Sequence, residues 1–171
     1  MTLDSFGLSN CLTFEKVTPS VKRGKFDIIR NFFLAFKRTT THTMKKANIL
    51  IIEDHEAVRL LLGLTFKNEY HVVTKRDGIE GLAYLSAGNM PDLIMLDMQM
   101  PRLSGLEFLR QLRASGFFAQ IPVLLVSGND DATENAQVFD LGIVDFIRKP
   151  FNPVSLREKV TTILAKRALA A

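Results

Sequence analysis

Disulfide bonds, membrane-spanning runs and clusters of metal-binding cysteine and histidine are all missing from this sequence. Its 171 residues include one cysteine, Cys11, which excludes an intrachain disulfide and is typical of a protein of the reducing cytoplasm, the location we expect. No apolar run approaches the roughly 18 residues that a membrane span needs. The three histidines, His42, His55 and His71, are scattered, so we expect neither a zinc site nor a hydrolase of the Ser/His/Asp type.

Positive charge is concentrated at the start of the chain. Residues 1–46 hold nine Lys/Arg and three Asp/Glu, whereas residues 47–171 hold thirteen and fifteen. The isoelectric point of about 9.3 therefore belongs to the N-terminal segment, and the rest of the chain is mildly acidic. The basic segment shows no helix-turn-helix pattern, and attraction to phosphate alone gives only salt-sensitive, nonspecific binding. We therefore expect no specific nucleic-acid partner.

A polar stretch without hydrophobic periodicity, residues 39–43, marks the boundary that we predict. It separates a basic N-terminal extension, residues 1–46, from a folded domain, residues 47–171. Two interpretations of the extension stay open: it is disordered, or Met44 is the true start of translation and the preceding residues are an error of the gene model. A third interpretation is a basic amphipathic helix on a membrane surface or a partner protein, based on the mixture of aromatic and basic residues there.

From Ala47 onward, strand and helix patterns alternate five times, which predicts an α/β fold with a parallel sheet and helices on both faces. The apolar runs that predict strands lie near residues 48–53, 70–74, 92–97, 121–126 and 144–148. The helical patterns lie near residues 55–68, 78–87, 105–115, 131–141 and 153–168.

Reactive side chains stand at the ends of four of these apolar runs. Glu53 and Asp54 follow the first run, and Asp97 closes the third. Ser127 follows the fourth, and Lys149 follows the fifth. The carboxyl ends of parallel strands lie along one edge of their sheet, where ligands of open α/β sheets bind. We therefore expect three carboxylates, a hydroxyl and an ammonium group to converge on one site.

The chemistry of that site favours Mg²⁺ and phosphoryl transfer. Clustered carboxylates are the oxygen ligands that Mg²⁺ prefers, and Asp97 can act as a nucleophile that forms an aspartyl-phosphate. Phosphoryl transfer mainly requires positioning and neutralisation of charge, which the metal, Lys149 and Ser127 would supply. Taken singly, the Glu53-Asp54 pair is typical of a helix cap, Lys149 of a surface lysine and Ser127 of a turn. Their occurrence together at strand ends favours the functional interpretation.

With these residues in place, nearly all of residues 47–171 resembles the receiver domain of two-component response regulators. The resemblance rests on the Glu53-Asp54 pair, on Leu96–Pro101 followed by Ser104-Gly105, on Ser127, and on Phe146–Phe151. It implies a flavodoxin-like fold, a doubly wound five-stranded parallel sheet of order 2-1-3-4-5 with five helices.

The resemblance also implies a role for each site residue. Asp97 would accept a phosphoryl group from the phosphohistidine of a sensor histidine kinase or a histidine phosphotransfer protein. Lys149 would contact the phosphoryl group, and its bond to Pro150 would be cis. Ser127 and Phe146 would be the switch pair that repacks the face made by the fourth helix, fifth strand and fifth helix for a downstream protein target. The implied Mg²⁺ ligands are the side chains of Glu53, Asp54 and Asp97 and the backbone carbonyl of Gln99.

Only four residues follow the last helix pattern, which ends near Arg167, so we expect a CheY-like single-domain response regulator. Such a protein is a phospho-acceptor in signalling, not an enzyme, although it assists its own phosphorylation and dephosphorylation. Two alternatives stay open. The chain is a phosphorelay intermediate that passes the phosphoryl group to a histidine phosphotransfer domain, or it is a receiver-like binding module that is used without phosphorylation.

Overall fold

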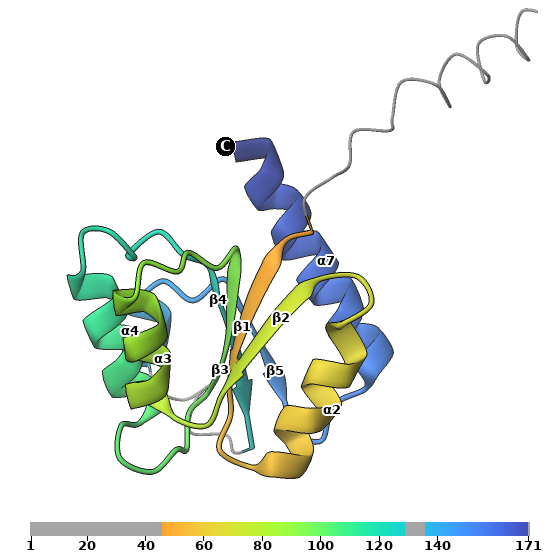
Figure 1. Cartoon of the computed structure of the whole chain (residues 1–171), viewed down its shortest axis with the longest axis horizontal. Coiled ribbons are helices and arrows are strands. Elements are labelled where there is room, and N and C mark those ends of the chain that lie inside the picture. Colours follow the sequence, from red (N-terminus) through yellow and green to blue (C-terminus); the bar gives the residue numbers. More distant parts are fainter. Residues whose placement is uncertain (1–45, 129–135, 171) are drawn as a thin grey trace, which may run out of the picture. The chain divides into compact units, whose positions relative to one another are not determined.

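The computed structural model describes residues 46–128 and 136–170, and these form a three-layer α/β fold (Figure 1). Its strands form one parallel sheet in the order β2-β1-β3-β4-β5, which confirms the flavodoxin-like topology. The strands are β1 Asn48–Ile52, β2 His71–Lys75, β3 Leu93–Asp97, β4 Val123–Ser127 and β5 Asp145–Arg148. The helices are α2 Glu56–Phe66, α3 Gly78–Ser86, α4 Gly105–Ala114, α6 Ala136–Asp140 and α7 Pro153–Ala170.

The expected and observed elements agree to within about two residues wherever the comparison can be made. The fourth strand begins at Val123 rather than near residue 121, because Pro122 has no amide hydrogen for the sheet ladder. The helix expected near 131–141 is seen as Ala136–Asp140, and its first residues lie outside the described part of the chain. Nearly all of the predicted extension, residues 1–45, also lies outside it.

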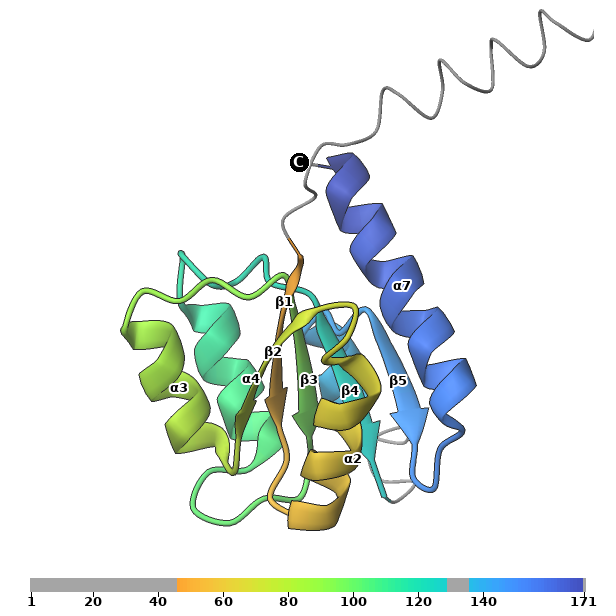
Figure 2. The same ribbon diagram turned by 45° about the vertical axis from the view of Figure 1, so that its right-hand side comes forward.

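The sheet is covered by helices on both faces, α3 and α4 on one side and α2 and α7 on the other (Figure 2). Alternate residues of each strand face opposite layers: Leu50 and Ile52 join the cluster of buried residues under α3 and α4, whereas Ile49 and Ile51 join the cluster under α2 and α7. Because both faces of the inner strands are buried, β1, β3 and β4 are almost continuously apolar, whereas the edge strands β2 and β5 carry exposed polar residues.

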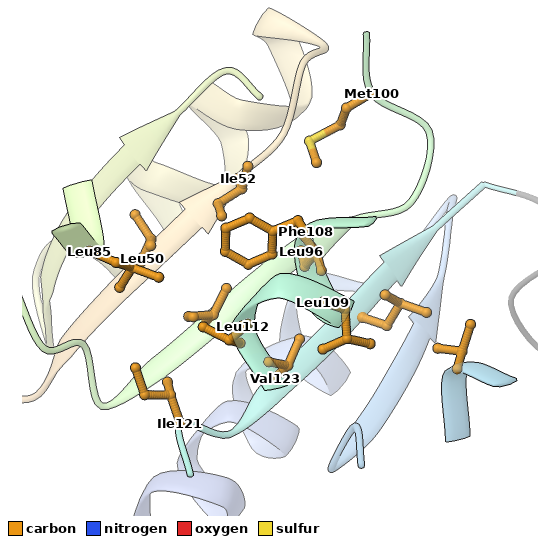
Figure 3. Close-up of a cluster of buried hydrophobic side chains, with 13 residues drawn as sticks. Leu50, Ile52, Leu85, Leu96, Met100, Phe108, Leu109, Leu112, Ile121 and Val123 are labelled. Carbon is orange, nitrogen blue, oxygen red and sulfur yellow. The ribbon is translucent and has the colours of Figure 1, made fainter. Parts of the chain in front are cut away.

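The cluster under α3 and α4 shows how closely these layers pack (Figure 3). The ring of Phe108 in α4 is fully buried, as is Ile52 of β1. A Cβ atom at Gly81 of α3 would stand 2.5 Å from Ile52 Cδ1 and 3.0 Å from Phe108. The glycine therefore lets α3 approach both the sheet and α4.

Side-chain caps fix where two of the helices begin. Asp77 accepts a hydrogen bond from the amide of Glu80 at 2.9 Å at the start of α3. Ser104 and Glu107 form a reciprocal capping box at the start of α4. These caps lie just beyond the carboxyl ends of β2 and β3, so they anchor loops at the edge of the sheet where the site is expected. No helix in the described ranges 46–128 and 136–170 is long and apolar enough to cross a membrane.

Candidate functional site

The carboxylates of Glu53, Asp54 and Asp97 meet at the carboxyl edge of the sheet. One oxygen from each lies within 4.8 Å of the others. Glu53 follows β1 and Asp97 ends β3, and these neighbouring strands pair in register up to Ile52 and Leu96. Glu53 is 1% exposed and Asp97 5%, whereas Asp54 is exposed to solvent. Glu53 and Asp97 therefore form the buried part of the cluster, and Asp54 marks its open, solvent-facing side.

Lys149 joins the two buried carboxylates. Its Nζ donates to Oε1 of Glu53 at 2.9 Å and to Oδ2 of Asp97 at 3.0 Å. The same Nζ lies 2.7 Å from Oε2 of Glu53, an ionic contact without hydrogen-bond geometry. The Lys149–Pro150 peptide is cis. The backbone holds the lysine in place, because its amide donates to the carbonyl of Ser127 at 2.7 Å. Lys149 therefore pairs with two of the three carboxylates of the cluster.

This crowding of negative charge perturbs ionisation. Burial, together with the nearby Asp97 carboxylate, raises the pKa of Glu53 to about 7 despite the opposing effect of Lys149. Burial disfavours the Lys149 ammonium, but its bonds to Glu53 and Asp97 outweigh that effect and raise the pKa of Lys149. The lysine is therefore charged at neutral pH, while Glu53 is poised between its two protonation states.

Ser127 and Phe146 lie next to this cluster on β4 and β5. Ser127 is the last residue of β4 and is 4% exposed. Phe146 is half-buried, pairs with Leu125 in the sheet, and meets the ring of Phe139 on α6 edge to face at 6.2 Å. Gln99, two residues after Asp97, places its amide 3.5 Å from Asp97 Oδ1. Glu53, Asp54, Asp97, Gln99, Ser127 and Lys149 are thus found at this edge of the sheet, whereas Phe146 lies two residues further inside, opposite Leu125.

Two supporting residues carry no role in the sequence interpretation. The Arg59 guanidinium donates to the carbonyls of Glu53 and Asp54, both at 2.9 Å, and so holds the loop that presents them. Gly105 lies against the backbone of β3, where a Cβ atom would stand 2.2 Å from the carbonyl oxygen of Asp97. Gly105 belongs to the recognised motif, but only the structure shows this contact. For Arg59, the one sequence feature that could have suggested this role is its position five residues after the Glu53-Asp54 pair.

The donor set fits a hard divalent cation. All the candidate ligand atoms are oxygens, as Mg²⁺ prefers. Among the described residues, no donor reaches the buried Oε2 of Glu53 with hydrogen-bond geometry. The Lys149 ammonium lies 2.7 Å from this oxygen but is shared with Asp97, so it compensates the negative charge of the three carboxylates only in part. Glu53, Asp54 and Asp97 therefore make an acidic pocket suited to Mg²⁺.

Comparison with known proteins identifies the family. The model of the response regulator receiver domain matches residues 49–161. The chain belongs to the response regulator receiver domain family. Receiver domains of two-component systems interact with histidine kinases, and phosphorylation and Mg²⁺ binding at an acidic pocket are typical of the family. This receiver domain therefore belongs to a signalling protein.

Relatives in sequence and a similar solved structure both support the assignment. Response regulator MprA of Mycobacterium sp. (strain KMS) is 39% identical over 120 residues, which are 69% of this chain and 50% of MprA. Hybrid signal transduction histidine kinase D of Dictyostelium discoideum is 31% identical over 132 residues, 77% of this chain but 8% of the kinase. Chemotaxis response regulator CheY4 of Vibrio cholerae has a similar structure, with a TM-score of 0.64 and 26% identity, covering 69% of this chain and 98% of that one.

The receiver domain therefore occurs in proteins of different architecture. The chain spans about half the length of the response regulators that it matches in sequence. One of these relatives, YkoG of Bacillus subtilis (strain 168), is 37% identical over 122 residues and is described as an uncharacterized transcriptional regulatory protein. The expectations of a single-domain regulator, a cytoplasmic location and no specific nucleic-acid partner stay predictions.

Proposed function

We propose that Asp97 accepts a phosphoryl group from a histidine kinase, or from a histidine phosphotransfer protein, and that the modified domain signals by binding a downstream protein. The observation that carries the proposal is the convergence of the Asp97, Glu53 and Asp54 carboxylates within 4.8 Å beside Lys149. We assign the proposed receiver domain to residues 47–171, as the sequence predicts.

In the proposed reaction, a carboxylate oxygen of Asp97 attacks phosphorus while the bond to the donor's histidine nitrogen breaks, its electron pair staying on the ring. Lys149, 3.0 Å from Asp97 Oδ2, is placed to turn its ammonium toward the incoming phosphoryl oxygens. Ser127 offers a hydroxyl to another of these oxygens. Glu53 and Asp54, with Asp97 and the Gln99 carbonyl, would hold Mg²⁺, which when bound neutralises charge on the transferred group.

The proposed output is a change of packing around Phe146. If the Ser127 hydroxyl turns toward the phosphoryl group, the half-buried Phe146 ring can move inward, because it has no polar group to satisfy. Its edge-to-face contact with Phe139 would then change. Phe139 of α6 and Val144, just before β5, are 46% and 49% exposed, so this surface already offers apolar side chains to a protein target.

The proposed docking helix for the kinase is α2, which begins two residues after Asp54. Its outer side carries Leu60, Leu61 and Leu64, which are 58%, 45% and 57% exposed. Apolar side chains gathered on a helix beside a reaction site suit contact with a partner's helical surface. A donor docked there would bring its phosphohistidine to the open side of the carboxylate cluster.

A labelling experiment tests the proposal. The protein is incubated with Mg²⁺ and phosphoramidate or acetyl phosphate, and its intact mass is measured beside Asp97→Asn and a sample with EDTA. Addition of one phosphoryl group that is lost in both controls would support the mechanism. Labelling that persists in Asp97→Asn would contradict it, and no labelling under any condition would favour the alternative of an unphosphorylated binding module.

The phosphorelay alternative uses the same Asp97 chemistry but a different acceptor. Phosphorylated protein is purified and mixed with histidine phosphotransfer proteins, and the label is followed. Transfer from Asp97 to histidine faster than hydrolysis would favour a phosphorelay intermediate. Hydrolysis alone would favour a regulator that acts by binding its target.

A further inference from the structure

Arg102 adopts an unusual backbone conformation beside the site. Its φ of 68° makes it the one residue other than glycine with positive φ among residues 46–128 and 136–170. Side chains disfavour this left-handed region, which glycine occupies easily. Such outliers persist where the surroundings hold them, often at functional sites. The contacts of the Arg102 side chain therefore indicate what holds this conformation in place.

The Arg102 guanidinium forms an ion pair with Asp77, and that contact fixes its position. The Asp77 side chain is 2% exposed and the Arg102 side chain is 50% exposed. The other oxygen of Asp77 accepts the amide of Glu80 at 2.9 Å as the cap of α3. One end of the ion pair is therefore rigid and buried, which holds the guanidinium at the surface in a defined place.

That place is the open side of the reaction site. Asp54, Arg76, Asp77, Pro101 and Arg102 line an open pocket of about 450 Å³. Arg76, two residues before α3, forms an ion pair with Glu80 in the first turn of that helix. It brings a second guanidinium to the pocket. The pocket is large enough for a small phosphorylated molecule, and it adjoins the carboxylate that completes the acidic cluster with Glu53 and Asp97.

Arg76 and Arg102 bring positive charge to a pocket beside three carboxylates. A phosphoryl donor is an anion, and it must approach the carboxylates of Glu53, Asp54 and Asp97. The half-buried Lys149 pairs with only two of them. Positive charge at the rim of such a cleft raises the local concentration of anions, and more so for a dianion than for a monoanion. Although Arg102 pairs with the buried Asp77, its side chain is 50% exposed and lines the pocket, so its charge is open to a ligand there.

We propose that Arg102, with Arg76 beside it, is a specificity-determining residue that favours dianionic acyl phosphates as direct phosphoryl donors to Asp97. Acetyl phosphate is the simplest member of the class. A carboxylate oxygen of Asp97 bonds to phosphorus as the bond between phosphorus and the acyl oxygen breaks, and acetate leaves with that electron pair. The inference rests on the proposed role of Asp97, and it concerns which residue selects among small-molecule donors.

The test compares two donors in matched variants. Acetyl phosphate is a dianion near neutral pH, whereas phosphoramidate carries a net single negative charge, so the ratio of their second-order rate constants reports selection by charge. Arg102→Gln removes the charge, and Arg102→Lys keeps it at the same backbone position. Arg110→Gln makes the same change in net charge on the exposed side of α4, away from the pocket. Each rate constant is measured by intact mass with saturating Mg²⁺ at low salt.

The expected result is a fall in the acetyl phosphate to phosphoramidate ratio of roughly three- to five-fold in Arg102→Gln, since one charge near a dianion has an effect of this order in water. Arg102→Lys should stay within about two-fold of the unmodified protein, and Arg110→Gln should leave the ratio unchanged. An unchanged ratio in Arg102→Gln, or an equal fall in Arg110→Gln, would overturn the inference. Failure of both donors to label the unmodified protein would instead contradict the role of Asp97.

Discussion

Glu53 is the single residue whose chemistry depends most on its surroundings. It is almost fully buried, shares Lys149 with Asp97, and has one oxygen without a hydrogen-bond donor among the described residues. A glutamate in water would be fully ionised at neutral pH. Here burial moves its ionisation into the physiological range, so both stability and metal binding should respond to pH.

The first prediction concerns Glu53 and pH in metal-free protein. Its pKa is about 7 in the folded state against an ordinary value of 4.5, so the folded state binds this proton more tightly. The stabilisation from this proton is fully present below about pH 4.5 and is lost as pH rises through about 7. With EDTA present, the free energy of unfolding should therefore fall more steeply over that range in the unmodified protein than in Glu53→Gln.

Urea unfolding at a series of pH values measures the effect. Glu56→Gln, which removes an exposed carboxyl group from α2, is the control and should follow the unmodified profile. Parallel profiles for Glu53→Gln and the unmodified protein would show that Glu53 ionises in the folded state as it does in the unfolded chain.

Among the helices, α4 depends most on close contact with a strand. Its first residue, Gly105, donates its amide to the Met98 carbonyl at 3.0 Å. A Cβ atom there would lie 2.2 Å from the Asp97 carbonyl oxygen and 2.8 Å from Met98 Cα. These are backbone atoms, so they cannot yield by changing rotamer. The N-terminus of α4 is therefore packed directly against the backbone of Asp97 and Met98.

The second prediction follows from this contact. Gly105→Ala should lower the free energy of unfolding by about 1–3 kcal/mol, the usual effect of overpacking. It should also slow labelling of Asp97, because the backbone behind that residue must shift. Gly116→Ala is the control, since nothing lies within 4 Å of the added atom. Chemical denaturation of both variants decides the matter, and equal stabilities would refute the steric argument.

The third prediction concerns how α4 holds the loop between α6 and β5. Arg113 donates to the carbonyls of Leu141 at 2.7 Å and Gly142 at 3.0 Å, and to two more carbonyls before β4. Burial lowers the pKa of Arg113, but the group stays charged and satisfies these acceptors. Arg113→Met should therefore destabilise the fold by about 2 kcal/mol, because it leaves these carbonyls without a charged donor.

Arg110→Met, on the exposed side of the same helix, controls for the loss of a charge and of an arginine stem. Amide hydrogen exchange over residues 136–144 gives a second measurement, and protection there should fall in Arg113→Met alone. Loss of stability without any change in exchange at this loop would place the effect elsewhere.

Across the whole molecule, two apolar layers support one polar edge. The residues under α3 and α4 and those under α2 and α7 form separate buried clusters, and the sheet lies between them. Neighbouring strands β1 and β3 deliver the acidic residues from the middle of this sheet. A ligand that binds these residues joins the ends of two adjacent inner strands, so its binding should stabilise the whole fold.

The fourth prediction is that Mg²⁺ stabilises the protein through the acidic pocket. At a free concentration of ten times its dissociation constant, a ligand specific for the folded state adds about 1.4 kcal/mol, or roughly 3–6 °C in Tm for a domain of this size. The shift should be smaller at pH 5 than at pH 8, since Glu53 must lose its proton to bind the metal. Calorimetry with and without Mg²⁺ measures it, and an equal shift in Asp97→Asn would indicate binding elsewhere.

Much of the fold could be predicted because its signals are local. The apolar runs from β1 to β5 and the helical periodicity between them need only short windows of sequence, and capping residues such as Asp77 and Ser104 mark helix starts. The site could be predicted for a related reason. Parallel strands bring their carboxyl ends to one edge, so residues that follow strands meet there whatever their separation along the chain.

The contacts that tune the site required the tertiary structure. The Arg59 bonds behind Glu53, the approach of Gly105 to Asp97 and the ion pair between Arg102 and Asp77 are set by how loops and helices pack in three dimensions. Such contacts follow no period in the sequence, and their effect depends on burial. The pattern of residue types therefore specifies which groups are present and at which edge of the sheet, while packing specifies their distances, their exposure and hence their charge.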